Sequence, residues 1–392
     1  MIGLAKLASG PGNVGLAERD EREPGPGEVL LRVSGAGVCG TDLHIEADEY
    51  PSEPPVTMGH EVSGVVAAVG EGVDSEWLGE RVVCETYYST CGACEWCRDG
   101  RPNLCPERRS IGSFVDGGFA AQVVMPVKGV HRIPDWLDEH AAVLAEPLAC
   151  VCHCLLDPSK VAPGDRVLVT GPGPIGLLAA QVARALGGDV LVVGLPSDEP
   201  RLAVANELGL ATEAGGPSQT DFDVVIECSG SAGGAATCLE SARRGGSYVQ
   251  IGVFGKPVTV PLDRVFQKEL VVTSGFASTP QSWRRALRLI GERRVELLPL
   301  VSEVVPLSDW ERVFADLRAG RAIKVVFDPR TVTQRAGEAG SAVTGERPEA
   351  AVTQRAGEAG SAVTGERPEA AVTQRAGEAG SAVTGERPRR PR

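Results

Sequence analysis

Four cysteines lie in the stretch "CGACEWCRDGRPNLC", which spans residues 91–105. They follow the pattern CxxCxxCx7C and are Cys91, Cys94, Cys97 and Cys105. Four soft thiolates that converge tetrahedrally make a closed zinc site, and an iron–sulfur cluster with similar spacing is the main alternative. Four unrelated buried thiols are disfavoured because the loop is rich in Gly, Arg and Asp. Since the protein would fill every coordination position, we predict a structural zinc without room for a substrate.

A second set of potential ligands is spread over the three motifs "GVCGTDLH", "MGHEVSG" and "LAEPLAC". The residues in these motifs that could bind a metal ion or carry a proton are Cys39, Thr41, Asp42, His44, His60, Glu61 and Glu146. Taken singly, each has an ordinary explanation, such as a small core cysteine, a turn histidine or a charge at a helix start. Together, one thiolate, one imidazole and one carboxylate predict a catalytic zinc site with a position left open for substrate.

A glycine-rich turn follows the apolar strand in "VLVTGPGPIG" and leads into the apolar-periodic stretch "LLAAQVARALG". The turn reads G-x-G-x-x-G and contains Gly171, Gly173, Pro174, Ile175 and Gly176. Between a strand and a helix, this motif points backbone amides and the helix N-terminus at a dinucleotide pyrophosphate. A glycine-rich turn without a ligand is the alternative. The context favours an NAD(P)-binding site.

The end of the next strand should select between NAD+ and NADP+. In the NAD form, an acidic residue about twenty positions after the glycines bonds the ribose and repels a 2′-phosphate. Here the strand reads "DVLVVGLPSDEPRL", and the expected position near Gly194 has no side chain. Acidic residues follow only at Asp198 and Glu199, where a turn could bring one back. With Ser197 and Arg201 close enough in sequence to meet a phosphate, we expect NADP+ to be tolerated and lean towards it.

The pattern of apolar residues, glycines and prolines around these motifs changes along the chain. Residues 1 to about 155 mix short β-like runs with Gly- and Pro-rich turns, which predicts an irregular all-β domain. From about 157 to 290, "DRVLVTG", "DVLVVG", "FDVVIECSG" and "GSYVQIGVFG" alternate with helical stretches, which predicts a parallel sheet. A last strand, "AIKVVFDP", closes near residue 329, and we expect it to return to the first domain.

A twenty-residue repeat follows. "VTQRAGEAGSAVTGERPEAA" begins at Val332 and recurs at Val352, and a further copy begins at Val372. A folded solenoid is the alternative to a disordered tail. Each copy offers little apolar material beyond two valines and some alanine, so stacking would not offset the ordering entropy. We predict that residues 330–392 are disordered.

Composition narrows the function classes. The chain has 392 residues, 42% of them hydrophobic, and a net charge of -13, which disfavours nucleic acid and anionic membranes as partners. The N-terminal stretch lacks a basic run followed by an apolar segment and a cleavage site. Eleven cysteines, an odd number, are then expected as thiols and metal ligands in the cytoplasm.

In this combination and order, "GVCGTDLH", "GHEVSG", the four-cysteine lobe, "EPL" and the Rossmann glycines resemble the zinc-dependent medium-chain dehydrogenases. That family includes alcohol, sorbitol and threonine dehydrogenases. The resemblance covers residues 1 to about 329 and implies an α/β protein in which a GroES-like, mostly β catalytic domain is split around a Rossmann domain. We place these domains at 1–156, with the zinc lobe at 91–105, then 157–292, and a return segment at 293–329. The resemblance also implies a homodimer or homotetramer.

The resemblance further implies roles for single residues. Cys39 and His60 are expected to bind the catalytic zinc, with Glu61 or Glu146 as the third ligand, directly or through water. Thr41 and His44 resemble the family's proton relay through the cofactor ribose. Asp42 either bonds the distal nitrogen of His60 or is an exposed turn residue. The neighbouring "CVCHC", residues 150–154, could suggest a metal site, but the resemblance implies a buried connecting helix. Because alternating positions cannot share one helix face, core packing is expected there instead.

These expectations amount to an enzyme with two zinc ions per subunit and NAD(P)+, which oxidises a secondary alcohol to a ketone. The "EPL" form favours a polyol, sugar or cyclitol. An L-threonine 3-dehydrogenase-like or general alcohol dehydrogenase is the alternative within the family. From other classes, a noncatalytic nucleotide-sensing scaffold and a zinc-bearing binding module remain as alternatives.

Overall fold

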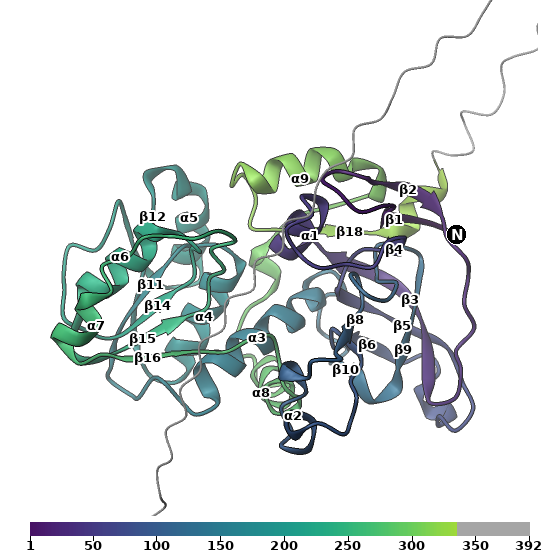
Figure 1. Cartoon of the computed structure of the whole chain (residues 1–392), viewed down its shortest axis with the longest axis horizontal. Coiled ribbons are helices and arrows are strands. Elements are labelled where there is room, and N and C mark those ends of the chain that lie inside the picture. Colours follow the sequence, from purple (N-terminus) through teal and green to yellow (C-terminus); the bar gives the residue numbers. More distant parts are fainter. Residues whose placement is uncertain (335–392) are drawn as a thin grey trace, which may run out of the picture. The chain divides into compact units, whose positions relative to one another are not determined.

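The structure, a computed structural model, describes residues 1–334 (Figure 1). The repeat tail predicted from residue 330 lies outside the described part from residue 335 on. Within the described part, no helix has the length and apolar character needed to cross a membrane.

Strands from residues 2–132 and two strands near the end of the described chain form three sheets, in which all pairs are antiparallel except that of the last two strands. Three of them form a small sheet in the order β2-β1-β4: β2 (Val14–Glu18), β1 (Ile2–Lys6) and β4 (Val56–Thr57). A larger sheet has the order β10-β6-β5-β3-β18-β17, with β9 also paired to β3: β10 (Val130–Arg132), β6 (Arg81–Cys84), β5 (Glu61–Val69), β3 (Glu28–Gly37), β18 (Lys324–Phe327), β17 (Val301–Val305) and β9 (Gln122–Pro126). A two-stranded ribbon joins β7 (Tyr87–Ser89) to β8 (Arg109–Ser110).

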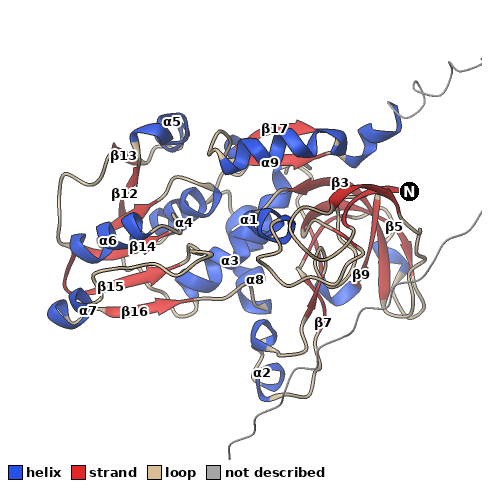
Figure 2. Ribbon diagram, turned by 45° about the horizontal axis from the view of Figure 1, so that its top comes forward, coloured by secondary structure: helices blue, strands red, loops and turns tan. Residues whose placement is uncertain are grey.

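The chain between these strands forms a parallel sheet of six strands in the order β13-β12-β11-β14-β15-β16. The strands are β13 (Ala211–Ala214), β12 (Asp189–Gly194), β11 (Arg166–Thr170), β14 (Phe222–Glu227), β15 (Ala242–Gln250) and β16 (Val271–Ser274). This is the doubly wound order of a dinucleotide-binding fold. Strands and helices alternate along it, as Figure 2 shows. The predicted α/β class with a Rossmann sheet is therefore confirmed.

The α-helices are α1 (Gly40–Glu46), α2 (Glu95–Arg98), α3 (Ala145–Leu156), α4 (Pro174–Ala185), α5 (Glu199–Glu207), α6 (Ala232–Ser241), α7 (Asp263–Lys268), α8 (Pro280–Gly291) and α9 (Trp310–Arg318). Short 3₁₀ turns lie at Ser75–Trp77, Pro102–Leu104, Val127–Gly129, Ala141–Leu144, Pro196–Asp198, Leu298–Leu300, Leu307–Asp309 and Pro329–Gln334. Helix α1 falls where the sequence predicted only β structure, and α3 extends beyond both ends of the helix predicted at residues 150–154. Tertiary packing explains α3, since its apolar residues fill the core instead of alternating along a strand.

Alternation along β11 explains how the parallel sheet is covered on both faces. Val167 and Val169 belong to the core cluster that includes α4, while Leu168 belongs to the cluster that includes α6. Side chains at alternate positions of a strand point to opposite faces, so one apolar strand serves two helix layers.

Helix α3 lies at the centre of the largest core cluster, between α4 and α8. Its "CVCHC" segment is helical, as predicted, and Cys152 and Cys154 are buried. The helix begins at Ala145, and this start places Glu146 in its first turn.

Strand β18 returns to the N-terminal half of the chain. It pairs antiparallel with β3, with Val326 opposite Gly37 and Phe327 opposite Ala36. The pairing brings Lys324 next to the N-terminal half of the sheet, more than 260 residues along the chain from Glu61. The motifs of residues 39–61 are therefore held partly by the end of the described chain.

Candidate functional site

The four lobe cysteines converge. One sulfur from each of Cys91, Cys94, Cys97 and Cys105 lies within 4.8 Å of the others. The lobe itself arranges them, because Cys94 caps the N-terminus of α2 and Cys105 ends the 3₁₀ turn at Pro102–Leu104. Backbone N–H groups of Ala93 and Cys94 lower the pKa of the Cys91 thiol to about 7. The pKa of Cys94 is instead raised to about 11 and that of Cys105 is also raised, so it is the convergence of four sulfurs that fits the donor set of a closed zinc site.

A second cluster brings together Cys39, His60 and Glu61, whose ligand atoms also lie within 4.8 Å of one another. Cys39 is the N-cap of α1, His60 immediately precedes β5, and Glu61 opens that strand. His60 and Glu61 are buried, while Cys39 is half-buried. One sulfur, one nitrogen and one carboxylate oxygen are ligands that suit an open zinc site.

Asp42 is fully buried behind this cluster, so the exposed-turn alternative for it is wrong. Its Oδ2 accepts a hydrogen bond of 2.9 Å from the Cys39 N–H and thereby fixes the start of α1. Its Oδ1 lies 3.8 Å from His60 Nδ1, which is longer than a hydrogen bond, and has no hydrogen-bond partner. The carboxylate stands in position to orient His60 without bonding it in this structure.

Glu61 is held by a residue that sequence reasoning missed. The Lys324 Nζ donates to both Glu61 oxygens, at 2.8 and 2.6 Å, and to the Val38 carbonyl oxygen. Both side chains are buried, and Gly37 leaves the necessary space, because a Cβ there would lie 2.2 Å from Glu61 Oε2. The feature of the sequence that could have predicted this contact is a single lysine inside the apolar strand "AIKVVFDP".

Glu146 is buried close to the same cluster. Its Oε1 accepts a 2.7 Å hydrogen bond from the Thr86 hydroxyl, and the Cys150 thiol donates to the same oxygen at 3.5 Å. Burial raises the pKa of Glu146, and the positive charge of His60 opposes that shift. Glu146 is not among the residues whose ligand atoms converge with Cys39, which distinguishes it from Glu61.

The electrostatics of the cluster favour a bound cation. Burial lowers the pKa of His60, but the charges of Cys39, Asp42 and Glu146 outweigh it and hold this pKa well above its ordinary value. Burial also disfavours the charged form of Asp42, and this raises the pKa of its carboxyl group. Several acidic groups buried together around one imidazole are stabilised by a divalent ion, so the donor set fits zinc.

Thr41 and His44 lie on α1 as the motif predicts. The Cys39 thiol donates to the Thr41 hydroxyl at 3.7 Å. His44 Nδ1 lies 2.7 Å from Glu49 Oε2, and its side chain is 35% exposed. A Cβ added to Gly255 would lie 2.9 Å from the His44 ring, so the loop after β15 contacts α1. His44 therefore joins the cluster's helix to solvent.

The glycine turn has the geometry of a pyrophosphate cradle. Gly171 has a φ of +90°, and a Cβ on it would lie 2.7 Å from Ser229. A Cβ on Gly176 would lie 1.9 Å from the Gly171 carbonyl oxygen, while one on Gly173 would meet only open space. Gly173 caps α4, whose first residue is Pro174; Ile175 packs on the core. The three glycines thus serve a tight turn, ligand approach and helix packing.

At the end of β12, the turn brings Asp198 back beside Gly194, because a Cβ on Gly194 would lie 3.1 Å from that of Asp198. Asp198 already accepts from the Leu195 N–H at 2.9 Å and pairs with Arg201 at 3.5 Å. Arg201 also donates to the Ala322 carbonyl oxygen at 2.7 Å, while Ser197 is exposed. Arg201 therefore offsets the nearby acidic charge.

Glu227 is a further residue that sequence reasoning missed. It ends β14, is fully buried, and accepts hydrogen bonds from the Ser229 and Gly230 N–H groups and from Gln250 Nε2 at 2.8 Å. The carboxylate thereby ties together the loops after β14 and β15 at the carboxyl edge of the parallel sheet. The signal was an acid at the end of the apolar strand "FDVVIE".

Comparison with known proteins gives consistent matches. The family model described as "Alcohol dehydrogenase GroES-like domain" matches residues 25–135, and the one described as "Zinc-binding dehydrogenase" matches residues 174–292. The chain is 38% identical over 343 residues to a sorbitol dehydrogenase of Halalkalibacterium halodurans, covering 84% of this chain and 99% of the relative. It is 31% identical over 342 residues to a D-arabitol-phosphate dehydrogenase of Enterococcus avium, covering 84% and 97%.

A solved structure agrees with these matches. A zinc-binding dehydrogenase from Sinorhizobium meliloti 1021, bound to NADP, is similar with a TM-score of 0.76 and 33% identity over 84% of this chain and 99% of that chain. The GroES-like half expected from the sequence is therefore confirmed together with the Rossmann half.

Proposed function

This chain belongs to the zinc-dependent medium-chain dehydrogenases, and we propose that it oxidises a secondary alcohol group of a polyol to a ketone, with hydride transfer to NAD(P)+. The convergence of Cys39, His60 and Glu61 carries the proposal. Its test is reduction of the nicotinamide with a panel of polyols, sugars, cyclitols and L-threonine. Turnover of L-threonine above all polyols would favour the alternative activity, and no turnover of any alcohol would favour a noncatalytic scaffold.

Within this reaction, Cys39 and His60 hold the catalytic zinc, with Glu61 as the third ligand. Convergence supports Glu61, and its pairing with Lys324 makes it a weakened ligand. Glu146 lies further out and acts through water. A bound zinc would supply Lewis acidity, lowering the pKa of a substrate hydroxyl. Glu61→Gln and Glu146→Gln separate the two roles: only the first should lower zinc affinity strongly.

The chain's own residues manage the proton and the cofactor. Thr41, beside Cys39, and His44, beside Glu49, would relay the proton to solvent through the ribose of the bound cofactor. The glycine turn binds the pyrophosphate, and Glu227 positions the loops that face the nicotinamide half. NAD(P)+ supplies the hydride acceptor when bound. Asp42 fixes the start of α1 through the Cys39 N–H.

NADP+ should be accepted comparably to NAD+ or better. Gly194 has no side chain, and Arg201 pairs with Asp198 and offsets its charge towards a 2′-phosphate, while the exposed Glu199 begins α5. The relative from S. meliloti binds NADP. Gly194→Asp should shift kcat/KM towards NAD+, although a Cβ there would lie 2.9 Å from the Pro172 ring. Arg201→Gln, which frees Asp198, should shift it in the same direction. A wild-type preference for NAD+ of about a hundredfold, ~2.7 kcal/mol, would contradict this.

We place the catalytic segments at 1–156 and 293–329 and the cofactor domain at 157–292, supported by which strands share a sheet. A homodimer or homotetramer is supported by the open edge of β16, where Val271 and Val272 are 59% and 51% exposed and Phe266 of the adjoining helix α7 is 86% exposed. Val272→Lys should lower the mass measured by light scattering. A cytoplasmic location is supported by the eleven cysteines, all unpaired in the structure.

A further inference from the structure

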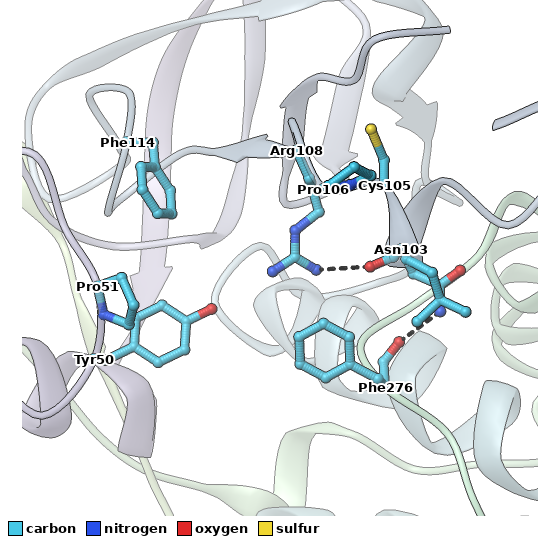
Figure 3. Close-up of a pocket in the computed structure, with 9 residues that line it drawn as sticks. Tyr50, Pro51, Asn103, Cys105, Pro106, Arg108, Phe114 and Phe276 are labelled. Atoms are coloured by element: carbon cyan, nitrogen blue, oxygen red, sulfur yellow. Dashed lines mark hydrogen bonds between the residues drawn. The ribbon is translucent and has the colours of Figure 1, made fainter. Parts of the chain in front are cut away.

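A cavity of about 420 Å³ lies beside the zinc lobe. Its walls come from the segment after α1 (Tyr50 and Pro51), the end of the lobe (Asn103), the chain that follows the lobe (Arg108 and Phe114) and the loop after β16 (Phe276). Figure 3 shows the Arg108 guanidinium projecting between Tyr50 and Phe276. The volume suits a small ligand, and the walls are aromatic with one cation.

Arg108 places a positive charge in this cavity that forms no ion pair with a carboxylate of residues 1–334. Its guanidinium lies over the rings of Tyr87 and Phe276, 5.3 and 4.8 Å from their centroids. Its one hydrogen bond goes to the Asn103 carbonyl oxygen, at 3.3 Å. Within residues 1–334, no carboxylate forms an ion pair with it. A guanidinium has five N–H donors, so most of those on Arg108 remain available to a ligand.

Its sequence neighbour Arg109 is the opposite case. Arg109 donates to both carboxylate oxygens of Glu53, at 2.9 and 2.6 Å, and to the Phe114 carbonyl oxygen at 2.7 Å. The two adjacent arginines thus differ in whether the protein has already satisfied them. Arg109 is a matched control for Arg108.

The cavity shares its supports with the candidate catalytic cluster. Arg108 stacks on Tyr87, and the preceding Thr86 donates to Glu146, which lies close to His60. On the other wall, the Tyr50 N–H donates to the His44 carbonyl oxygen at 3.3 Å. Two short chain segments, Thr86–Tyr87 and His44–Tyr50, therefore join the surroundings of the cavity to those of the cluster.

We propose that Arg108 binds an anionic group, a phosphate or a carboxylate, at the far end of the substrate, so that the polyol oxidised by this enzyme is an anionic one. The inference rests on the proposed function for its reaction and on Arg108 for its charge. The planar guanidinium matches two oxygens of a phosphate or carboxylate at once, and it lies over the rings of Tyr87 and Phe276. The aromatic walls contact the carbon chain.

The test compares matched pairs of substrates in wild type, Arg108→Gln, Arg108→Lys and Arg109→Gln. The pairs are galactitol with galactitol 1-phosphate and sorbitol with sorbitol 6-phosphate, and gluconate represents a carboxylate. Wild type should prefer the anionic partner in kcat/KM by about tenfold or more. Arg108→Gln should remove that preference by raising KM, Arg108→Lys should restore part of it, and Arg109→Gln should leave it within about twofold. A preference for gluconate alone would identify a carboxylate as the anion.

Calorimetric binding of galactitol 1-phosphate to the zinc-loaded enzyme gives a second readout. Loss of binding in Arg108→Gln, with binding retained in Arg109→Gln, supports the anion site. If no polyol is turned over in the same preparation, the proposed function is contradicted while the anion site is still supported. If the free polyols were oxidised with the same kcat/KM as their phosphates and gluconate, the anion site would be overturned, while the proposed dehydrogenase activity would be retained. An equal loss for both members of each pair, with a lower Tm, would also overturn it and show that Arg108 only supports the lobe.

Discussion

The lobe cluster and the candidate catalytic cluster each gather metal-ligand atoms within 4.8 Å, yet they are built in different ways. The lobe takes its four sulfurs from residues 91–105, and three of these cysteines are only half-buried. The catalytic cluster takes its ligands from the N-cap of α1 and the start of β5, and β18 supplies the lysine that holds Glu61.

This difference determines what each site depends on. In the lobe, local turns and backbone N–H groups orient the thiolates, and little charge is removed from water. In the catalytic cluster, buried charges incur a desolvation cost that partners from distant segments must offset. A closed site can therefore stabilise a loop, while an open, buried site depends on the whole fold.

The largest effect should come from removing a catalytic ligand. Cys39→Ser should lower kcat by about 10³-fold or more, roughly 4 kcal/mol of transition-state stabilisation. Metal analysis should show one zinc lost per subunit and the lobe zinc retained. Only one zinc in the wild type, or iron with sulfide, would contradict the division into two sites.

Next in size is the loss of the lysine that supports the buried cluster. With the catalytic zinc site empty, Lys324→Met leaves the Glu61 carboxylate buried without its partner, which should cost about 3–5 kcal/mol and lower Tm by about 10 °C. The double variant Lys324→Met/Glu61→Gln removes the unpaired charge and should recover most of the loss. A double variant no more stable than Lys324→Met would show that the pair is not the source of the effect.

A lobe ligand should matter less for chemistry and more for stability. Cys94→Ser should release the lobe zinc and lower Tm by about 5 °C, or ~2 kcal/mol, while the residual folded enzyme keeps its catalytic zinc. Kinetics normalised to the catalytic zinc should change little. A loss of kcat as large as that of Cys39→Ser would break the proposed separation of roles.

The smallest effect concerns His44, at the exposed end of the proposed relay. His44→Ala should slow turnover about tenfold near neutral pH, with recovery at high pH, where solvent hydroxide takes the proton directly. The pH profile of kcat tests this, with Glu49→Gln as a milder companion. An unchanged profile would remove His44 from the proton path.

Much of this protein follows from short stretches of its sequence. The lobe cysteines, the glycine turn and the alternation of "DRVLVTG" with helices each specify a local structure, so spacing alone predicted their geometry. The family resemblance predicted a buried helix at "CVCHC", and helical geometry favoured core packing over a metal site there, because alternating positions do not share a helix face.

Only the tertiary structure could place the residues whose partners are far away in sequence. Lys324 meets Glu61 because β18 pairs with β3, and Asp42 lies fully buried beside His60. The backbone of one turn brings Asp198 next to Gly194. Within residues 1–334, Arg108 forms no ion pair with a carboxylate, whereas Arg109 forms one with Glu53. Sequence by itself determined which groups were present and how local turns arrange them. Burial and long-range pairing decided which charges are neutralised and which remain for a ligand, because those depend on contacts that no local pattern encodes.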